Sequence, residues 1–290
     1  MKGGIRPLGY TIIEVMIFLA VSGLMFILAA TFISGKQGAV EFKQGMSDAN
    51  TQIRSVVNEV ANGEYPSLSA SSLSCYAPAN SLLPPVIGSI VTGNAAQGAN
   101  GGQSSGIGNT TGCIFLGKVM QFDVAGNRRN FNVYTIAARQ TDASGLAVTT
   151  FNNAQPIAVS QLTDPRGLEN GLEITKILVC TSTSVCTQIG AFGFFGSFGS
   201  YNATSGDLQS GAQSIITAPV PGSLYGDSVA GTIGQIKTGL ASNMMTPIDN
   251  GSYILLCFQN GNQKGSVTIG GTGGQQFTTE LNTGGAAAGC

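Results

Sequence analysis

An apolar run close to the amino terminus constrains this chain more than any other part of its sequence. The run extends from Tyr10 to Ile33, and Glu14 is its only charged residue. As a helix it would be roughly 36 Å long at about 1.5 Å per residue, which is enough to cross a bilayer core of about 30 Å. We therefore expect a membrane-spanning helix.

Two simpler interpretations of the run leave Glu14 unexplained. A secretory signal peptide usually has an apolar region of about 7 to 15 residues, which is shorter than this run. A plain anchor would be oriented by Lys2 and Arg6, which precede the run and favour the cytoplasmic side. A signal peptide would also not carry a carboxylate near the start of this region, and in a plain anchor a carboxylate inside the spanning helix costs about 2.5 to 3.5 kcal/mol. Such a carboxylate needs a positively charged partner.

Cleavage of the chain between Gly9 and Tyr10 would supply this partner. The new amino terminus would carry an ammonium group about one helical turn from Glu14. In a bundle of parallel helices, the Glu14 carboxylate of one chain could instead pair with that ammonium group on the next chain. This hypothesis connects cleavage, the charge in the apolar run and the assembly of several copies.

The segment G-Y-T-I-I-E-V at residues 9–15 follows a short basic leader and opens the apolar run. It resembles the class III signal of type IV pilins and type II secretion pseudopilins, and the resemblance covers about residues 1–62. It implies that a membrane-embedded prepilin peptidase cuts after Gly9 and that Tyr10 becomes N-methylated. It also implies that Glu14 is the acid that pairs during assembly. The family usually has Phe where this chain has Tyr10.

The resemblance further implies a function and a set of partners. The chain would be a structural subunit of a type IV pilus-like filament, and its length favours a minor or tip pilin. Its partners would be other pilin subunits, the peptidase, and an inner-membrane assembly platform with a cytoplasmic ATPase. The head would lie outside the cell membrane before assembly and in an extracellular or periplasmic filament afterwards. A type II secretion pseudopilin and a pilin-like DNA-uptake receptor or adhesin are the alternatives.

Beyond the apolar run, the spacing of apolar residues predicts that the same helix continues with two different faces. One face collects Val40, Phe42, Met46, Ala49, Ile53, Val56, Val57 and Val60. The opposite face collects Glu41, Lys43, Asp48, Arg54 and Glu59. Asn62 and Gly63 provide a stop, so residues 10–62 form one helix whose apolar stripe packs against the rest of the chain. In filaments of the family that this chain resembles, the subunit's helix melts locally. The resemblance therefore implies that the helix melts near Gly23 on assembly.

The remainder of the chain is predicted to form a head rich in β-strands. Residues 64–112 are loop-rich, and strand-rich runs follow from Cys113. Turn residues at 126–127, 181–185 and 260–262 divide these runs into three hairpins. Hairpins in series predict an antiparallel sheet, and a long helix packed on that sheet gives an α+β fold, similar to the pilin-like fold. The expected segments are a leader (1–9), a spanning helix (10–33), an amphipathic extension (34–62) and a head (63–290).

Six cysteines indicate disulfide bonds formed in an oxidising compartment. They are Cys75, Cys113, Cys180, Cys186, Cys257 and Cys290, with no C-x-x-C pair, and the chain has no histidine. A metal site is therefore not expected. Cys180 and Cys186 flank a short hairpin connection where a disulfide would fit, whereas the sequence leaves the full pairing open. A Cys257–Cys290 bond would resemble the carboxy-terminal disulfide region of type IV pilins.

The absence of histidine also excludes catalysis by a Ser-His-Asp triad or a Cys-His pair. The G-Q-S-S-G sequence at 102–106 matches the serine-hydrolase elbow formally, but the required strand and helix are not predicted around it. We expect neither an enzymatic activity nor a cofactor.

The balance of charges provides no global attraction for nucleic acid, because the formal net charge is -1. The candidate for a weak contact with DNA phosphates is a local patch near one predicted hairpin, formed by Lys118, Arg128, Arg129 and Arg139. A solvated hairpin end is the favoured interpretation of these residues.

Residues 190–201 combine four Phe and one Tyr with glycine and serine. If buried, this stretch fills part of the core; if exposed, it would be an adhesive or subunit-contact surface. Burial is the favoured interpretation, and the exposure of Phe194, Phe195 and Phe198 distinguishes the two.

Overall fold

The computed structural model describes residues 11–62, 73–76, 85–89, 113–124, 127–142, 144–181, 185–196, 215–220, 240, 248, 251–270, 279–282 and 290. For some of these, among them residues 31–36, the backbone alone is described. Gly9, Tyr10, Phe198 and the G-Q-S-S-G sequence lie outside the described residues. The expected cleavage and methylation site therefore stays a prediction.

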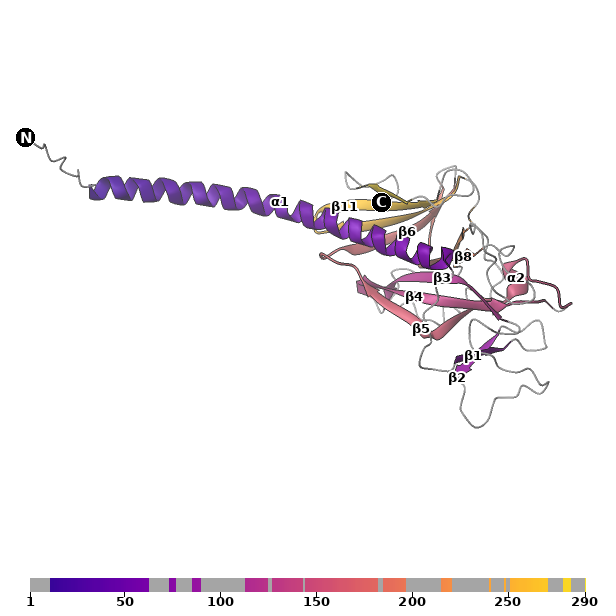
Figure 1. Ribbon diagram of the computed structural model, residues 1–290. Coiled ribbons are helices and arrows are strands. Elements are labelled where there is room, and N and C mark those ends of the chain that lie inside the picture. Colours follow the sequence, from indigo (N-terminus) through magenta and orange to yellow (C-terminus); the bar gives the residue numbers. More distant parts are fainter. Residues whose placement is uncertain are drawn as a thin grey trace, which may run out of the picture.

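A single continuous helix, α1 (Ile12–Ala61), forms the first element of the fold. Thr11 caps its first turn, so Ile12 is the first helical residue. The helix ends at Asn62, whose backbone N–H bonds back to carbonyl groups of the last turn. Figure 1 shows the first half of α1 projecting away from the head and the second half lying along it. The apolar run and the amphipathic extension are thus parts of one helix.

The projecting half of α1 is apolar and bare. Residues Ile12–Ala30 have a mean hydropathy of 2.6, and none of this span is buried. It is the one span among the described helices that is long and apolar enough to cross a membrane. Large side chains such as Phe18 (72% exposed) and Phe26 (75% exposed) have no cover from the rest of the described chain.

The described strands form two five-stranded antiparallel sheets and one two-stranded sheet. The first sheet has the order β12 (Thr279–Asn282), β11 (Gln263–Gly270), β10 (Tyr253–Asn260), β6 (Glu173–Cys180) and β7 (Cys186–Gln188). The second sheet has the order β5 (Ile157–Gly167), β4 (Asn127–Arg139), β3 (Cys113–Val124), β8 (Ala191–Gly196) and β9 (Ile215–Pro219). The small sheet pairs β1 (Leu73–Tyr76) with β2 (Val86–Ser89), and a short helix, α2 (Phe151–Ala154), precedes β5.

The head therefore contains two large sheets where the sequence predicted one antiparallel sheet, although the α+β class holds. The second half of α1 packs against both sheets (Figure 1), and its apolar stripe joins them into one core. The stripe is almost fully buried, with at most 1% exposure of Phe42, Met46, Ile53, Val56 and Val60. Their neighbours in this core come from both sheets and include Phe122, Phe192, Ile254 and Leu256. A stripe this wide is covered by two sheets because one sheet would leave a flank of the helix in water.

The three expected hairpins are present. β3 pairs with β4, β6 with β7, and β10 with β11. At the tip of the last hairpin, Gly261 has a φ of 56°, a left-handed conformation that glycine adopts at little cost. The other pairings are less local, since β8 pairs with β3 and β10 pairs with β6. These long-range pairings complete the two large sheets.

The phenylalanine-rich stretch forms β8, which is buried along its whole length. Phe192, Phe194 and Phe195 are each 0% exposed. Phe192 and Phe194 face the core that contains α1, whereas Phe195 packs on the other side of the second sheet, against Phe151. The predicted burial is confirmed for these three residues, and β8 offers no adhesive surface through them.

Close packing of β3 against β8 depends on a residue without a side chain. A Cβ atom added to Gly117 would lie 2.1 Å from the backbone oxygen of Phe194, closer than real Cβ contacts. The backbone of β8 would have to move to make room. Gly38 in α1 is the opposite case, because a Cβ atom there meets nothing within 4 Å.

We predict that Gly117→Ala lowers the free energy of unfolding by roughly 1 to 3 kcal/mol, the usual range for overpacking. Gly38→Ala is the matched control and should raise it by about 1 kcal/mol, because alanine favours the helix and has space there. Chemical unfolding of the full chain in detergent micelles measures both changes. Equal stability of the Gly117→Ala variant and the unmodified chain would contradict the close approach.

Candidate functional site

The first turn of α1 holds Glu14 by hydrogen bonds within the chain. The backbone N–H of Glu14 donates to the Thr11 hydroxyl oxygen at 3.3 Å. In return, Glu14 Oε2 accepts from the backbone N–H and from the hydroxyl of Thr11, each at 3.4 Å. This reciprocal arrangement is a capping box, and it places the carboxylate at the positive end of the helix dipole.

The capping box was missed by the sequence analysis, although the T-x-x-E spacing of Thr11 and Glu14 signals it. It shows that Glu14 has polar partners in its own chain before any assembly. Those hydrogen bonds supply no opposite charge. A carboxylate in apolar surroundings still favours a nearby cation. The pairing of Glu14 with a processed amino terminus stays a prediction.

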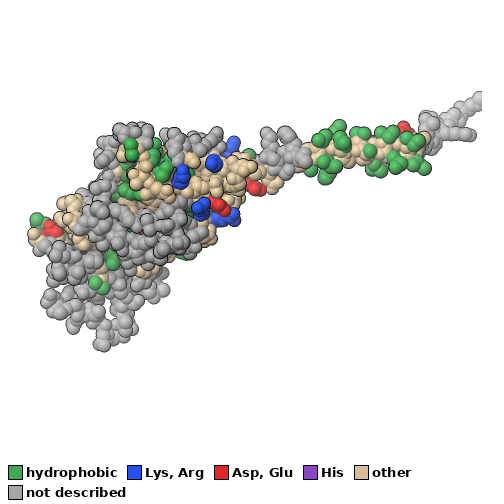
Figure 2. Space-filling model, turned by 180° about the vertical axis from the view of Figure 1, so that it is seen from behind, with side chains coloured by type: hydrophobic (Ala, Val, Ile, Leu, Met, Phe, Trp, Pro, Cys, Tyr) green, Lys and Arg blue, Asp and Glu red, His purple; other side chains and the backbone are tan. Residues whose placement is uncertain are grey.

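The surface that follows Glu14 is hydrophobic around the helix. Figure 2 shows hydrophobic side chains covering the projecting half of α1, with an acidic side chain near its end. A contiguous apolar surface of this kind is unstable in water and marks contact with lipid or with other protein chains. Gly23 lies within it, and a Cβ atom there would meet nothing within 4 Å. The helix is continuous through Gly23 in the single chain, whereas melting on assembly stays a prediction.

The second half of α1 is anchored in the head by a row of polar residues beside the apolar stripe. Asp48, Gln52, Ser55 and Glu59 recur at spacings of four, three and four, and we call this row the polar seam. The seam faces β5 and the turn after it. Gln52 Nε2 donates to the backbone oxygen of Gly167 at 3.2 Å, and Asn170 Nδ2 donates to Asp48 at 3.3 Å.

The seam corrects one expectation from the sequence. Asp48 and Glu59 were assigned to the face of the helix opposite the apolar stripe. They lie instead at the border of that stripe, where polar groups of β5 and its turn are in reach. Gly45 helps to bring the turn this close, because a Cβ atom there would lie 3.0 Å from the backbone oxygen of Glu169.

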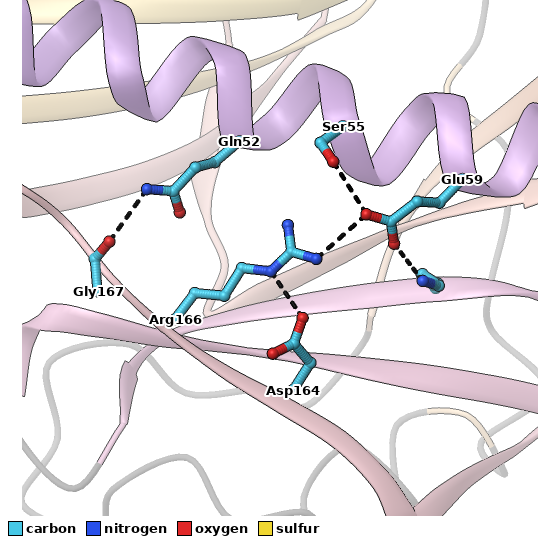
Figure 3. A network of polar contacts seen from close by, with 7 residues as sticks. Gln52, Ser55, Glu59, Asp164, Arg166 and Gly167 are labelled. Atoms are coloured by element: carbon cyan, nitrogen blue, oxygen red, sulfur yellow. Dashed lines mark hydrogen bonds and ion pairs between the residues drawn. The ribbon is translucent and has the colours of Figure 1, made fainter. Parts of the chain in front are cut away.

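Glu59 is the centre of a charged cluster between α1 and the second sheet (Figure 3). Its carboxylate accepts hydrogen bonds from Lys118 Nζ of β3, from Ser55 at 2.9 Å and from Arg166 Nη2 of β5 at 3.2 Å. Arg166 Nε in turn donates to Asp164 at 2.8 Å. We call these five residues the Glu59 cluster. The side chains of Glu59, Lys118 and Arg166 are 21%, 7% and 20% exposed, so the pairs are largely withdrawn from water.

The cluster holds the charge of Glu59 at a position where the helix alone would disfavour it. Glu59 lies in the last turn of α1, near the negative end of the helix dipole, and this turn contains no basic residue. Burial raises the pKa of Glu59, but this effect is outweighed by hydrogen bonds from Lys118, Ser55 and Arg166 and by the positive charge of Lys118, which lower the pKa. The resulting pKa of Glu59 lies below its ordinary value of 4.5.

The structure does not bring the four cations of the predicted DNA contact onto one surface. Lys118 is buried and paired with Glu59, and Arg139 is 5% exposed. Burial lowers the pKa of Arg139, whose Nε donates to the backbone oxygen of Thr141 at 3.4 Å. Neither side chain is available to a polyanion.

The other two cations lie at the far end of the same hairpin. Arg128 and Arg129 begin β4, whereas Arg139 ends it opposite Cys113. Arg129 forms an ion pair with Glu173 at 2.7 Å. The strand length separates the two ends, so the predicted patch is not formed.

Two disulfide bonds link described cysteines. Cys180–Cys186 joins β6 to β7 across the hairpin where the sequence analysis expected a bond to fit. Cys257–Cys290 ties the last residue to the middle of β10. Cys113 is also disulfide-bonded, while the side chain of Cys75 lies outside the described residues. Among the described residues, no group of three or more acidic, cysteine or histidine side chains is placed to hold a metal ion.

Comparison of the chain with protein-family models, with curated proteins and with solved structures finds no match. The structure itself therefore describes the kind of protein. It is an α+β protein with a disulfide-bonded head, and an exposed apolar helix projects from that head and begins with a capping box that contains the Glu14 carboxylate.

We predict that part of the stability of the head depends on the ionisation of Glu59. Because its folded-state pKa is lowered, its contribution is fully present above about pH 4.5 and is lost as the pH falls through the lower folded value. Glu59→Gln should cost about 1 to 3 kcal/mol at pH 7, with allowance for partial exposure, and should flatten the stability profile below pH 4.5.

Chemical unfolding of the full chain in detergent micelles at pH 7 and at acidic pH measures this contribution. Glu41→Gln is the matched control, since Glu41 is an exposed acid on the same helix. A Glu59→Gln profile as steep as that of the unmodified chain would show that Glu59 is not the group responsible.

Proposed function

We propose that this protein is a membrane-anchored filament subunit of the type IV pilin class, with a pilin-like head. The observation that carries the proposal is the division of α1 into two halves. The Ile12–Ala30 half is apolar and entirely exposed, and the apolar stripe of the second half, from Phe42 to Val60, is buried in the head. One continuous helix therefore belongs to two different environments.

Lipid covers the exposed half before assembly. The span is long enough to cross a bilayer core, and the short basic leader with Lys2 and Arg6 favours an orientation with the head outside. In a filament, the same surface is covered by the apolar helices of neighbouring subunits. Lipid and neighbouring helices both remove from water an apolar surface that is exposed in the single chain.

Glu14 supplies register to that packing. In a bundle of parallel helices, an apolar surface alone permits sliding along the axis. A charge near the start of each helix restricts sliding, because its pairing with an ammonium group on the neighbouring chain is favourable at one offset. Processing after Gly9 would create this ammonium group at Tyr10, as the motif implies.

The continuous helix also fixes where the head lies. α1 is about 75 Å long at roughly 1.5 Å per residue, and both its apolar stripe and the polar seam hold its second half. Helix packing in the filament therefore determines the position of every head. The large head with two sheets supports a minor or tip subunit, and a type II secretion pseudopilin is the alternative with the same leader and helix. The dispersal of the four cations does not support DNA uptake.

We predict that Glu14→Ala lowers the yield of filaments at least about tenfold, because a loss of about 1.4 kcal/mol on addition of a subunit already lowers the equilibrium constant of that step tenfold. The subunit should still fold and reach the membrane, since Glu14 makes no described contact with the head. Filaments sheared from native cells and sedimented, compared with the total subunit by immunoblot, provide the measurement.

Glu41→Ala is the matched control, because it removes an acid from the same helix outside the apolar half. It should assemble normally. Normal filament yield from the Glu14→Ala variant would refute the role of this carboxylate in assembly.

A further inference from the structure

One edge of the second sheet meets the last turns of α1 through polar contacts. β5 is an edge strand, and its pairing with β4 is irregular between Tyr134 and Ile136. Beyond that irregularity, the segment Thr163–Gly167 pairs with β4 but contains no buried residue. Val159 and Leu162, inside the irregularity, and Ala158, on its other side, are buried.

Polar contacts of α1 hold this outer segment. Arg166 reaches Glu59, and the backbone oxygen of Gly167 accepts from Gln52. Pro165, which lies between Asp164 and Arg166, has no backbone N–H to donate. The apolar core therefore contributes little within Thr163–Gly167, and it reaches this edge at the next residue, Leu168. The contact between α1 and Thr163–Gly167 depends on the seam and on the Glu59 cluster.

Lys118 makes this contact sensitive to the charge of Glu59. Its side chain is 7% exposed, and Glu59 is the acid within ion-pair distance of it among the described residues. Loss of the Glu59 charge would leave a buried ammonium group without its counterion, which is far more costly than loss of both charges together.

We propose that Glu59, Lys118 and Arg166 form a latch that keeps the last two turns of α1 closed on the Thr163–Gly167 segment. When the latch opens, this edge of the head separates locally while the apolar core stays folded. Apolar contacts earlier in the stripe, from Phe42 to Ile53, keep the rest of the helix packed in the open form. This inference goes beyond the proposed function and does not depend on assembly into filaments.

The closed latch has a mechanical consequence. A displacement of α1 along its axis is passed to β3 through Lys118 and to β5 through Arg166, in addition to the apolar core. These ion pairs add directional contacts to the interdigitated packing of the apolar core, which also resists sliding. The latch thereby keeps the helix at one position relative to the second sheet.

Hydrogen exchange of the full chain in detergent micelles tests the latch at peptide resolution. Relative to the unmodified chain, Glu59→Gln should accelerate exchange roughly a hundredfold or more at residues 54–61 and 163–169. The amides of β10 and β11, which do not touch the cluster, should accelerate less than these two segments, by no more than the loss of global stability that the same variant shows in chemical unfolding. Glu41→Gln, which removes an exposed acid from the same helix, should leave every rate unchanged.

Two further variants separate the parts of the latch. Arg166→Gln retains the Glu59–Lys118 pair, so it should accelerate exchange at 163–169 while the end of α1 stays protected. Arg166→Gln also tests the latch if the Glu59→Gln variant fails to fold. Glu59→Leu combined with Lys118→Met removes both buried charges and should restore protection at the end of α1 to within about tenfold.

Two results would overturn the proposal. In the first, residues 54–61 and 163–169 of Glu59→Gln exchange as slowly as they do in Glu41→Gln, and residues 163–169 of Arg166→Gln do the same. The second is equal acceleration across β10, β11 and the whole head, which would show general destabilisation without a local opening.

Discussion

Burial of one apolar stripe on α1 is the interaction on which the rest of this structure depends. The stripe from Phe42 to Val60 fills the space between two antiparallel sheets, and both sheets use it as part of their core. Each large sheet has an inner face that would be exposed without the helix. The same helix continues without a break to Ile12, so it joins the head directly to an apolar segment that the rest of the described chain leaves exposed. The packed core of the head and the exposed apolar segment are thus two parts of α1.

The polar contacts of α1 act at its two ends and do different work. At the start, Thr11 and Glu14 satisfy each other's backbone groups and place a carboxylate where the helix dipole favours it. At the end, Glu59 lies where the dipole disfavours it, and cations from two strands of the head compensate. The first carboxylate is exposed and available to a neighbouring chain. The second is enclosed and fixes the helix to its own head.

Much of this fold could be predicted from local patterns. The period of the apolar residues predicted the continuous helix and its buried stripe, and turn residues predicted the three hairpins and the position of the Cys180–Cys186 bond. The division into two sheets could not be predicted this way, because pairings such as β8 with β3 join strands that are distant in sequence. The T-x-x-E capping signal at Thr11 was present and overlooked.

The polar residues were harder to place than the apolar ones. A helical period separates an apolar stripe from its surroundings, but it does not say which bordering residues meet a strand. The helical period therefore placed Glu59 and Asp48 on the face opposite the stripe, although they contact β5 and its turn. Lys118 was grouped with three arginines of the same hairpin because its pairing partner lies on another element. Charged residues of this kind are placed by tertiary contacts.

Mass spectrometry of the amino terminus of the protein purified from its native membrane or filament tests the proposed function most directly. A chain that begins at Tyr10, with the mass of one added methyl group, is the predicted result. It would provide the cation that Glu14 requires in apolar surroundings. A chain that retains Met1 to Gly9 in the assembled form, or one that begins after the apolar run, would contradict assembly through α1.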